Sequence, residues 1–361
     1  MKNPDLTLSP RSLASVSLLF PAIVVSAGLL AACGGSDTGG SGGATTSTTT
    51  SSASGGGGSG GDTGTATGSS DPNILAGTFQ IQLIEEKPAN GSDPGTPGAT
   101  TVLGKVYDGA YPAQLVWELD TADGDCKLVK PRVPFCSTPC GGTAVCVEDE
   151  TCQDYPKAHS AGTVTAKGLQ TTDGKSEITM EPVANNYQVP VGTTLKYPAF
   201  AAGDDVSIHA AGDYYAAFDI ATKGIEQLVI TSATPDLKSG SPIDLAWTAP
   251  SKDVGATVHI KLDISHHGGT KGMIECDTAD DGAYSISADL VTKLLALGVA
   301  GYPTIVLTRR VLGSTTIAPG RVDLVLASPV ERTVTVDGLV SCTADTDCPQ
   351  GQTCQSDLSC K

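Results

Sequence analysis

Val258-His259-Ile260-Lys261-Leu262-Asp263-Ile264 decides the fold class, because apolar and polar residues alternate along its whole length. Alternation with a period of two places the two kinds of side chain on opposite faces of a strand, and is typical of half-buried antiparallel sheets. The sequence therefore predicts an all-β fold from about residue 74 to residue 340. The same pattern recurs in four other segments, Phe79–Leu83, Leu115–Leu119, Ile243–Trp247 and Val322–Leu326. Turn pairs separate such segments, at Asp123-Gly124, Asp173-Gly174, Gly268-Gly269 and Asp281-Gly282.

One short helix is predicted after Ser287, whose side chain can cap the first turn while Ile286 packs on Val291. Gly298 can end the helix, since glycine readily adopts the left-handed conformation found there. We expect the helix to cover an edge or an end of a sandwich. Its apolar face would consist of Leu290, Val291, Leu294 and Leu297.

The β-rich region is longer than one sandwich needs, so we expect two β-sandwich-like units. A turn-rich join at residues 234–240 would separate a first unit, residues 72–234, from an Ig-like second unit, residues 235–340. Trp247 is the expected core tryptophan of the second unit. That unit lacks the paired inter-sheet cysteines of antibody domains, so "Ig-like" describes its architecture only.

A tether is predicted ahead of the β-rich region. Residues 34–70 contain only Gly, Ser, Thr, Ala and Asp, which cannot bury apolar surface, so we expect residues 33–71 to be a disordered linker. A flexible chain of this length has a root-mean-square reach of about 35 Å.

Eleven cysteines are present, and ten of them follow the first, Cys33. An even number favours disulfides in an oxidising compartment. Zinc is the alternative, but the commonest spacing of five residues is wider than that of structural zinc sites, and only Cys136 and Cys140 would fit one. Two modules share this spacing: Cys136, Cys140, Cys146 and Cys152 within an insert at residues 126–152, and Cys342, Cys348, Cys354 and Cys360 within a C-terminal module at residues 341–361.

The connectivity is open at the level of sequence. We hypothesise that each module pairs its first cysteine with its third and its second with its fourth. This leaves Cys126 and Cys276, which would join the two units across 150 residues if they pair. In the chain-entropy model, a bridge closing such a loop contributes roughly 5 kcal/mol.

The N-terminal segment has the parts of a secretory signal peptide: Lys2 and Arg11, then an apolar run over residues 13–30. It ends in Leu30-Ala31-Ala32-Cys33, which resembles a bacterial lipobox. The resemblance implies cleavage of residues 1–32 and acylation of Cys33, and two or three acyl chains anchor a protein firmly. A retained transmembrane helix is the alternative, but the run is short and contains serines and a proline.

The resemblance to lipoproteins extends further. The neutral Gly34 and Gly35 imply, by the lipoprotein sorting rule, an outer-membrane lipoprotein, which we expect to be exposed at the cell surface. The segment Phe135–Cys140, the stretch Ile274–Asp277 and the tail from Ser341 resemble uncharacterised cysteine-rich lipoproteins of myxobacteria. That resemblance implies a cell-envelope protein and carries no catalytic residues.

Charge and aromatic content limit the partners. With 22 basic and 39 acidic residues the chain has a net charge of −17, which argues against nucleic acid and against an anionic lipid surface. Aromatic residues make up 4% of the chain, and no exposed aromatic row is apparent, which argues against a sugar-binding face. Trp117 is expected to point inward with its neighbouring leucines, and Arg309 and Arg310 to end a strand in solvent.

Candidate sites for chemistry are few. His266 and His267 are interpreted as exposed residues of a glycine-rich hairpin loop rather than metal ligands. Outside the Gly/Ser-rich tract of residues 34–70, no Gly-x-Ser-x-Gly elbow is present, and no phosphate-binding glycine loop occurs in a strand–helix context, so no enzyme is expected. Calcium is the one cofactor considered, because two acidic loops could supply oxygen ligands, although neither fits an EF-hand. The loops contain Asp277, Asp280 and Asp281, and Asp120, Asp123 and Asp125.

These observations favour a non-catalytic lipoprotein that displays a disulfide-stabilised β body for adhesion, recognition or envelope structure. Its partners would be the membrane, through the lipid, and an envelope or extracellular protein or glycan. The alternative is a surface module that binds or hydrolyses polysaccharide or peptide, with or without calcium, through the loops around His266 and Asp281.

Overall fold

The computed structural model describes residues 71–91, 94–113 and 115–361. The predicted signal peptide, Cys33 and almost all of the predicted tether lie outside these residues. The all-β prediction is confirmed, since the described chain forms nineteen strands, one α-helix and one 3-10 turn. Up to residue 223 the strands are β1 Asp71–Ile84, β2 Ala99–Val106, β3 Val116–Asp123, β4 Cys126–Arg132, β5 Ala144–Glu148, β6 Thr151–Asp154, β7 Val164–Lys167, β8 Glu177–Met180, β9 Asn186–Gln188, β10 Asp205–Ala210 and β11 Phe218–Lys223. The later elements are β12 Asp236–Leu237, β13 Ile243–Ala246, β14 Thr257–Asp263, β15 Met273–Ala279, β16 Ala283–Ile286, α1 Ala288–Leu295, β17 Thr304–Thr316, β18 Gly320–Thr333, β19 Thr335–Val336 and η1 Asp345–Asp347.

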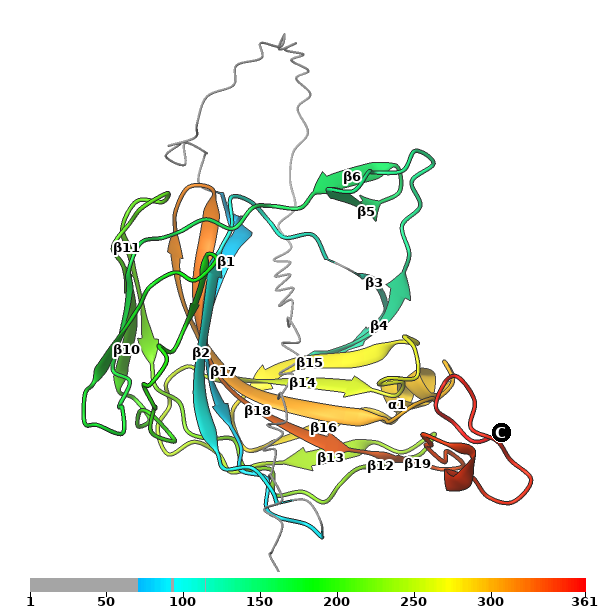
Figure 1. Ribbon diagram of the computed structural model, residues 1–361. Helices are drawn as coiled ribbons and strands as arrows, with labels where there is room; N and C mark the ends of the chain where they lie inside the picture. The colour runs from blue at the N-terminus through cyan, green and yellow to red at the C-terminus, as the bar shows by residue number, and fades with distance from the viewer. Residues whose placement is uncertain (1–70, 92–93, 114) are drawn as a thin grey trace, which may run out of the picture. The chain divides into compact units, whose positions relative to one another are not determined.

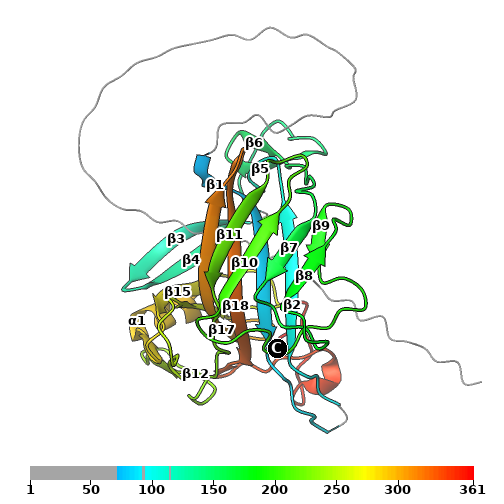
Figure 2. The same cartoon turned by 90° about the vertical axis from the view of Figure 1, so that its left-hand side faces the viewer.

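A nine-stranded sheet organises the fold, in the order β3-β4-β15-β14-β17-β18-β1-β2-β9. Its neighbours are antiparallel except β1 and β18, which run parallel. Strand β1 is therefore hydrogen-bonded on both sides, to β18 and to β2. A four-stranded sheet, β11-β10-β7-β8, covers part of the large sheet, as Figure 2 shows.

Two hydrophobic clusters fill the space between these layers. The first lies between the four-stranded sheet and one part of the large sheet, and the second lies where α1, β13 and β16 cover another part (Figure 1). Close approach of β11 to β17 in the first cluster requires Gly313, where a Cβ would lie 2.2 Å from the Ala221 carbonyl oxygen. The predicted sandwich-like packing is thus confirmed, and Trp247, 3% exposed, is a core residue of the second cluster.

The long hairpin of β17 and β18 contributes to both clusters. On β17, Ile305 and Leu307 belong to the second cluster and Val311 to the first. On β18, Val322, Leu324 and Leu326 contribute to the first cluster and Val330 to the second. The two strands run from the part covered by β10 and β11 to the part covered by α1 (Figure 1).

Arg309 on β17 and Ser328 on β18 lie at the point where the hairpin passes from one cluster to the other. They are direct partners in the antiparallel register, and each of the two residues is 1% exposed. The Ser328 hydroxyl accepts a hydrogen bond from the Leu228 N–H at 2.9 Å. Arg309 donates to the carbonyl oxygens of Gln227, at 3.0 Å, and Thr248, at 2.7 Å. Both residues thereby bind the segment that leads from the first cluster to the second.

Asp280 neutralises Arg309. Its carboxylate accepts from Arg309 Nε at 2.5 Å and Nη2 at 2.9 Å, and from Trp247 Nε1 at 2.8 Å. The two charged side chains are 1% and 3% exposed, so the pair is removed from water. Arg309 is therefore buried, and the prediction that it ends a strand in solvent was wrong. The apolar run before it continues into a thirteen-residue strand that passes between the two clusters.

The two units expected from the sequence, residues 72–234 and 235–340, are each one continuous segment of chain. Each of the two clusters, in contrast, contains residues from both segments. The large sheet takes β3, β4, β1, β2 and β9 from before residue 234, and β15, β14, β17 and β18 from after it. Along the chain, Cys126 and Leu128 already belong to the second cluster, the chain then returns to the first cluster, and it passes to the second again between Ile225 and Leu228.

The helix prediction is confirmed. The Ser287 hydroxyl accepts from the Leu290 N–H at 3.4 Å, which caps α1 at its start. Leu290, Val291 and Leu294 are buried in the second cluster. Gly298 has a φ of +87°, as expected of a residue that follows the helix end.

The inward orientation predicted around Trp117 was wrong. Trp117 is only partly buried, and Leu119 is 63% exposed. Strand β3 is an edge strand that pairs with β4 alone. Alternation shows which side chains share a face, but it does not show whether another layer covers that face.

The disulfides follow the hypothesised pairing. Cys126 and Cys276 are bonded, are direct partners on the neighbouring strands β4 and β15, and are both buried. The two modules use the alternating pattern, with bridges Cys136–Cys146, Cys140–Cys152, Cys342–Cys354 and Cys348–Cys360.

We expect Arg309→Met to lower the free energy of unfolding by about 3–5 kcal/mol, because the Asp280 carboxylate would stay buried without its partner. Equilibrium urea unfolding of the full chain, with its disulfides intact, measures the change. Replacing both partners, by Arg309→Met with Asp280→Leu, should cost less than the single change, since no lone charge is then buried.

Lys223→Ala is the control for this prediction, because it removes an ion pair with Asp205 whose side chains are 51% and 85% exposed. Its cost should stay below about 1 kcal/mol. An Arg309→Met variant as stable as the Lys223→Ala variant would contradict the structural role assigned to Arg309.

Removing the bridge between Cys126 and Cys276 with two alanines should cost about 5 kcal/mol, because the bridge closes a loop with a sequence separation of 150. The matched variant, Cys348→Ala with Cys360→Ala, removes a bridge whose cysteines are 12 residues apart, and should lower the free energy of unfolding by about 3 kcal/mol at most. Thermal unfolding followed by calorimetry compares the two. A larger effect for the C-terminal pair would refute the assignment of Cys126 and Cys276 as the main covalent brace.

Candidate functional site

Asp277, a calcium candidate, lies on β15 and is engaged by two basic side chains. Its Oδ1 atom lies 2.9 Å from Nδ1 of His259, its direct partner on β14, and also accepts a hydrogen bond from Arg310 Nη2. The hydrogen bond with His259 holds the pKa of the Asp277 carboxyl below its usual value, and Arg310 and Lys127 lower it further.

The other two carboxylates of this loop have different partners. Asp280 is occupied by Arg309 and Trp247, and Asp281 accepts only a long 3.4 Å contact from the Ala283 N–H, within its own turn. In the other acidic loop, Asp120 pairs with Lys130 at 2.5 Å. Neither loop brings three acidic side chains together within the described ranges, where the only groups of three possible metal ligands are disulfide-bonded cysteines. Calcium binding stays a prediction.

His266 and His267 lie in the loop between β14 and β15. Their rings are 3.9 Å apart, and His267 has a φ of +63°. The Tyr302 N–H donates to the His266 carbonyl oxygen at 2.8 Å, which fixes the loop against the following segment. Neither imidazole pairs with a carboxylate of the described chain. The structure thus brings the two histidines to each other and not to Asp281.

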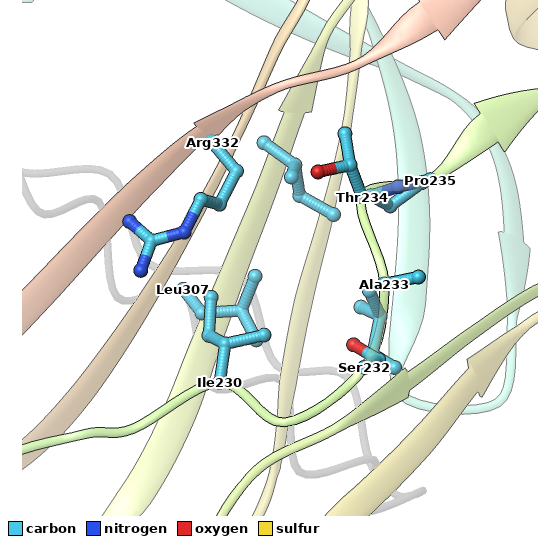
Figure 3. Close-up of a pocket in the computed structure, with 9 residues that line it drawn as sticks. Ile230, Ser232, Ala233, Thr234, Pro235, Leu307 and Arg332 are labelled. Carbon is cyan, nitrogen blue, oxygen red and sulfur yellow. The ribbon is translucent and has the colours of Figure 1, made fainter. Parts of the chain in front are cut away.

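A small cavity lies beside residues 233–235, between the β-strands of the second cluster (Figure 3). Its volume is about 50 Å³, and Figure 3 shows Arg332 across the space from Thr234. Arg332 is itself held by Glu85, at 2.6 and 3.1 Å. The buried Ser232 hydroxyl has no protein partner, so a water molecule there would satisfy it. A space of this size is far below the roughly 300 Å³ of the smallest usual ligand pockets.

Three tyrosine rings form an aromatic surface that the sequence did not reveal. The centroid of the Tyr111 ring lies 5.3 Å from that of Tyr107 and 5.6 Å from that of Tyr155. Tyr111 is 44% exposed and Tyr155 is 40% exposed. We call Tyr107, Tyr111 and Tyr155 the tyrosine surface. The expectation that no exposed aromatic row exists was wrong, because these residues lie on separate segments that only the fold brings together.

Strand β6 and the segment after it hold the tyrosine surface in place. Asp108 accepts a hydrogen bond from the Lys157 N–H at 2.7 Å, and its other oxygen lies 3.2 Å from His159 Nε2. The His159 ring stacks on Tyr214, with centroids 3.7 Å apart and planes within 7°. The Gln153 side chain donates to the Ala110 carbonyl oxygen at 2.8 Å.

Most of the tyrosines of the chain gather here. Besides the tyrosine surface and Tyr214, Tyr215 meets Tyr214 edge-on at 5.0 Å, and the Tyr187 hydroxyl accepts from the Ala161 N–H at 2.8 Å. Six of the nine tyrosines therefore surround the paired segments 107–111 and 155–162. The sequence signal that could have suggested the cluster is Tyr107, Tyr111 and Tyr155 beside turn-forming Gly and Pro residues outside the alternating segments.

We expect Asp277→Asn to lower the free energy of unfolding at pH 7, and to reduce the loss of stability that the wild type shows as the pH falls below about 4. The folded pKa of Asp277 is lowered, so the stabilisation is present above the unfolded pKa and disappears as the pH falls through the folded pKa. Urea unfolding at several pH values measures this, with Asp281→Asn in the neighbouring exposed turn as the control. Equal pH profiles for the wild type and Asp277→Asn would contradict the pairing.

No helix of residues 71–91, 94–113 and 115–361 is long and apolar enough to cross a membrane. A scan against protein-family models and a search of the curated proteins found no match to this chain.

Proposed function

We propose that this chain is a non-catalytic lipoprotein of the cell envelope, anchored through acylated Cys33, whose β body serves in recognition. The anchor would lie in the outer membrane, and the body would face outward. The single observation that carries the proposal is the use of the cysteines. All ten that lie in the described chain are paired in five disulfides, which fits a protein matured outside the reducing cytoplasm.

The distribution of the cysteines supports the lipid assignment. Cys33, the one cysteine outside the described chain, follows Leu30-Ala31-Ala32, so it has the sequence context of an acylated residue, and no cysteine of the body is left over to pair with it. A tether with a reach of about 35 Å would hold the body clear of the lipid headgroups. The net charge of −17 would further disfavour contact with an anionic surface.

The braced body supports a display role. Four of the bridges close loops with separations of 10 or 12 residues, in modules that are too small to form a core of their own. Such bridges suit an extracytoplasmic protein that has to keep its loops ordered. They add no reactive thiol, because bonded cysteines do not titrate.

The second candidate is a module that binds polysaccharide or peptide, and the tyrosine surface favours it. The loops around His266 and Asp281, which the sequence suggested for this role, lie at opposite ends of the β14–β15 hairpin. Tyr111 and Tyr155 instead offer exposed rings on rigidly held loops. The two candidates are compatible, since an anchored protein can bind through this surface.

Lipidation is tested by mass analysis of the N-terminal peptide from the full chain expressed in a bacterial host with lipoprotein processing. We expect the peptide to begin at Cys33 and to carry acyl chains, and expect globomycin to preserve the uncleaved form. Cys33→Ala should abolish both the acyl mass and the membrane association.

Ser36→Ala, three residues further along, is the matched control and should change nothing. Protease shaving of intact cells then reports which way the body faces. A wild-type chain recovered with residues 1–32 attached and Cys33 unmodified would overturn the proposed anchor.

A further inference from the structure

We propose that the tyrosine surface binds the faces of neutral sugar rings in an oligosaccharide or polysaccharide. This inference rests on the recognition role proposed above, but it does not depend on the lipid anchor. It assigns the ligand class to Tyr107, Tyr111 and Tyr155, which stabilise neither hydrophobic cluster. The axial hydrogens of a pyranose form an apolar face that stacks on an aromatic ring, while its hydroxyls stay in water or meet polar groups.

The exposure of the rings is the first argument. Tyr111 and Tyr155 keep 44% and 40% of their surface in solvent although each contacts another tyrosine. Large aromatic side chains contribute most when buried, so exposed rings in contact mark a surface that a partner can cover. The chain is poor in aromatic residues, at 4%, which makes their gathering at one place informative.

The second argument is that the rings are held before any ligand arrives. The loop that carries Tyr111 is fixed by Gln153 on Ala110, and Asp108 beside Tyr107 is fixed by the Lys157 N–H and by His159. A preformed surface loses little conformational entropy on binding. Neighbouring rings are inclined by 56° and 52°, so a ligand that follows them has to twist along its length. A glycan chain of linked rings can do so.

The polar groups around the rings favour a neutral ligand. Lys105 Nζ lies 5.4 Å from the centroid of the Tyr107 ring and is thus already engaged with an aromatic face. Asp108 and the overall charge of −17 would repel an anionic polysaccharide. The tyrosine hydroxyls and the partly exposed Asp108 carboxylate, whose side chain is 33% exposed, can meet sugar hydroxyls.

A proline-rich peptide is the other ligand that stacks on tyrosines, and it docks in grooves lined by aromatic residues. Tyr111 and Tyr155 are 44% and 40% exposed, and such an open pair of aromatic residues suits the flat face of a sugar better. We therefore make the peptide an outcome of the test.

The test is isothermal titration of the full chain, purified in detergent, with cellohexaose, maltohexaose and chitohexaose, and with a decaproline peptide. We expect at least one hexasaccharide to bind with a Kd below about 1 mM, corresponding to about −4 kcal/mol. Tyr111→Ala and Tyr155→Ala should each weaken that binding about tenfold. Tyr111→Phe keeps the ring and should stay within about threefold of the wild type.

Leu119→Ala is the matched control, since Leu119 is 63% exposed and lies on β3, outside the tyrosine surface. Thermal unfolding of every variant shows whether the fold is intact, and Tyr155→Ala serves if Tyr111→Ala is destabilised. Absence of binding to all three sugars, binding unaffected by both alanine variants, or binding of decaproline alone would overturn the proposal. Any of these outcomes would leave the anchor at Cys33, which is read from the mass of its peptide, untouched.

Discussion

The guanidinium group of Arg309 lies where the two hydrophobic clusters meet, and the rest of the body depends on the partners that bind it there. Arg309 binds a carboxylate and the carbonyl oxygens of two separate segments, and Ser328, its partner across the hairpin, binds the Leu228 N–H. An apolar pair at these positions would leave the polar backbone of residues 226–228 without partners inside the protein. The polar pair therefore lets the chain pass between two apolar regions and still lets β17 and β18 run on without a break. It fixes where one cluster ends and the other begins.

The continuous hairpin of β17 and β18 links the two clusters, because both strands contribute side chains to each of them. A domain usually has a core that could fold by itself, with few contacts across its boundary. Here the same two strands supply apolar side chains to both cores, and the bridge from Cys126 to Cys276 ties an early strand to a late one. If one cluster unfolds, the other loses part of the apolar packing that the shared strands provide.

The sequence predicted what depends on local pattern and missed what depends on spatial neighbours. Alternation identified strands such as β14, and the capping residue Ser287 identified α1, because both signals act within one element. The shared spacing of the two cysteine modules likewise led to the right pairing. Alternation could not reveal that Leu119 lies on an uncovered edge strand or that Arg309 meets Asp280, since both facts depend on segments far away in the sequence. The tyrosine surface was not predicted for the same reason, because Tyr111 and Tyr155 are 44 residues apart in the sequence and meet only in the fold.

The position of β1 has a mechanical consequence. The described chain begins with Asp71, the first residue of a fourteen-residue strand that pairs with β18 between Asp71 and Gln82 on one side and with β2 between Gly77 and Ile84 on the other. Tension applied through the preceding residues acts along that strand, so its many hydrogen bonds share the load in shear and cannot be peeled apart one at a time. A body pulled from this end therefore resists extraction of its first strand, and forced unfolding is governed by the rate of that step.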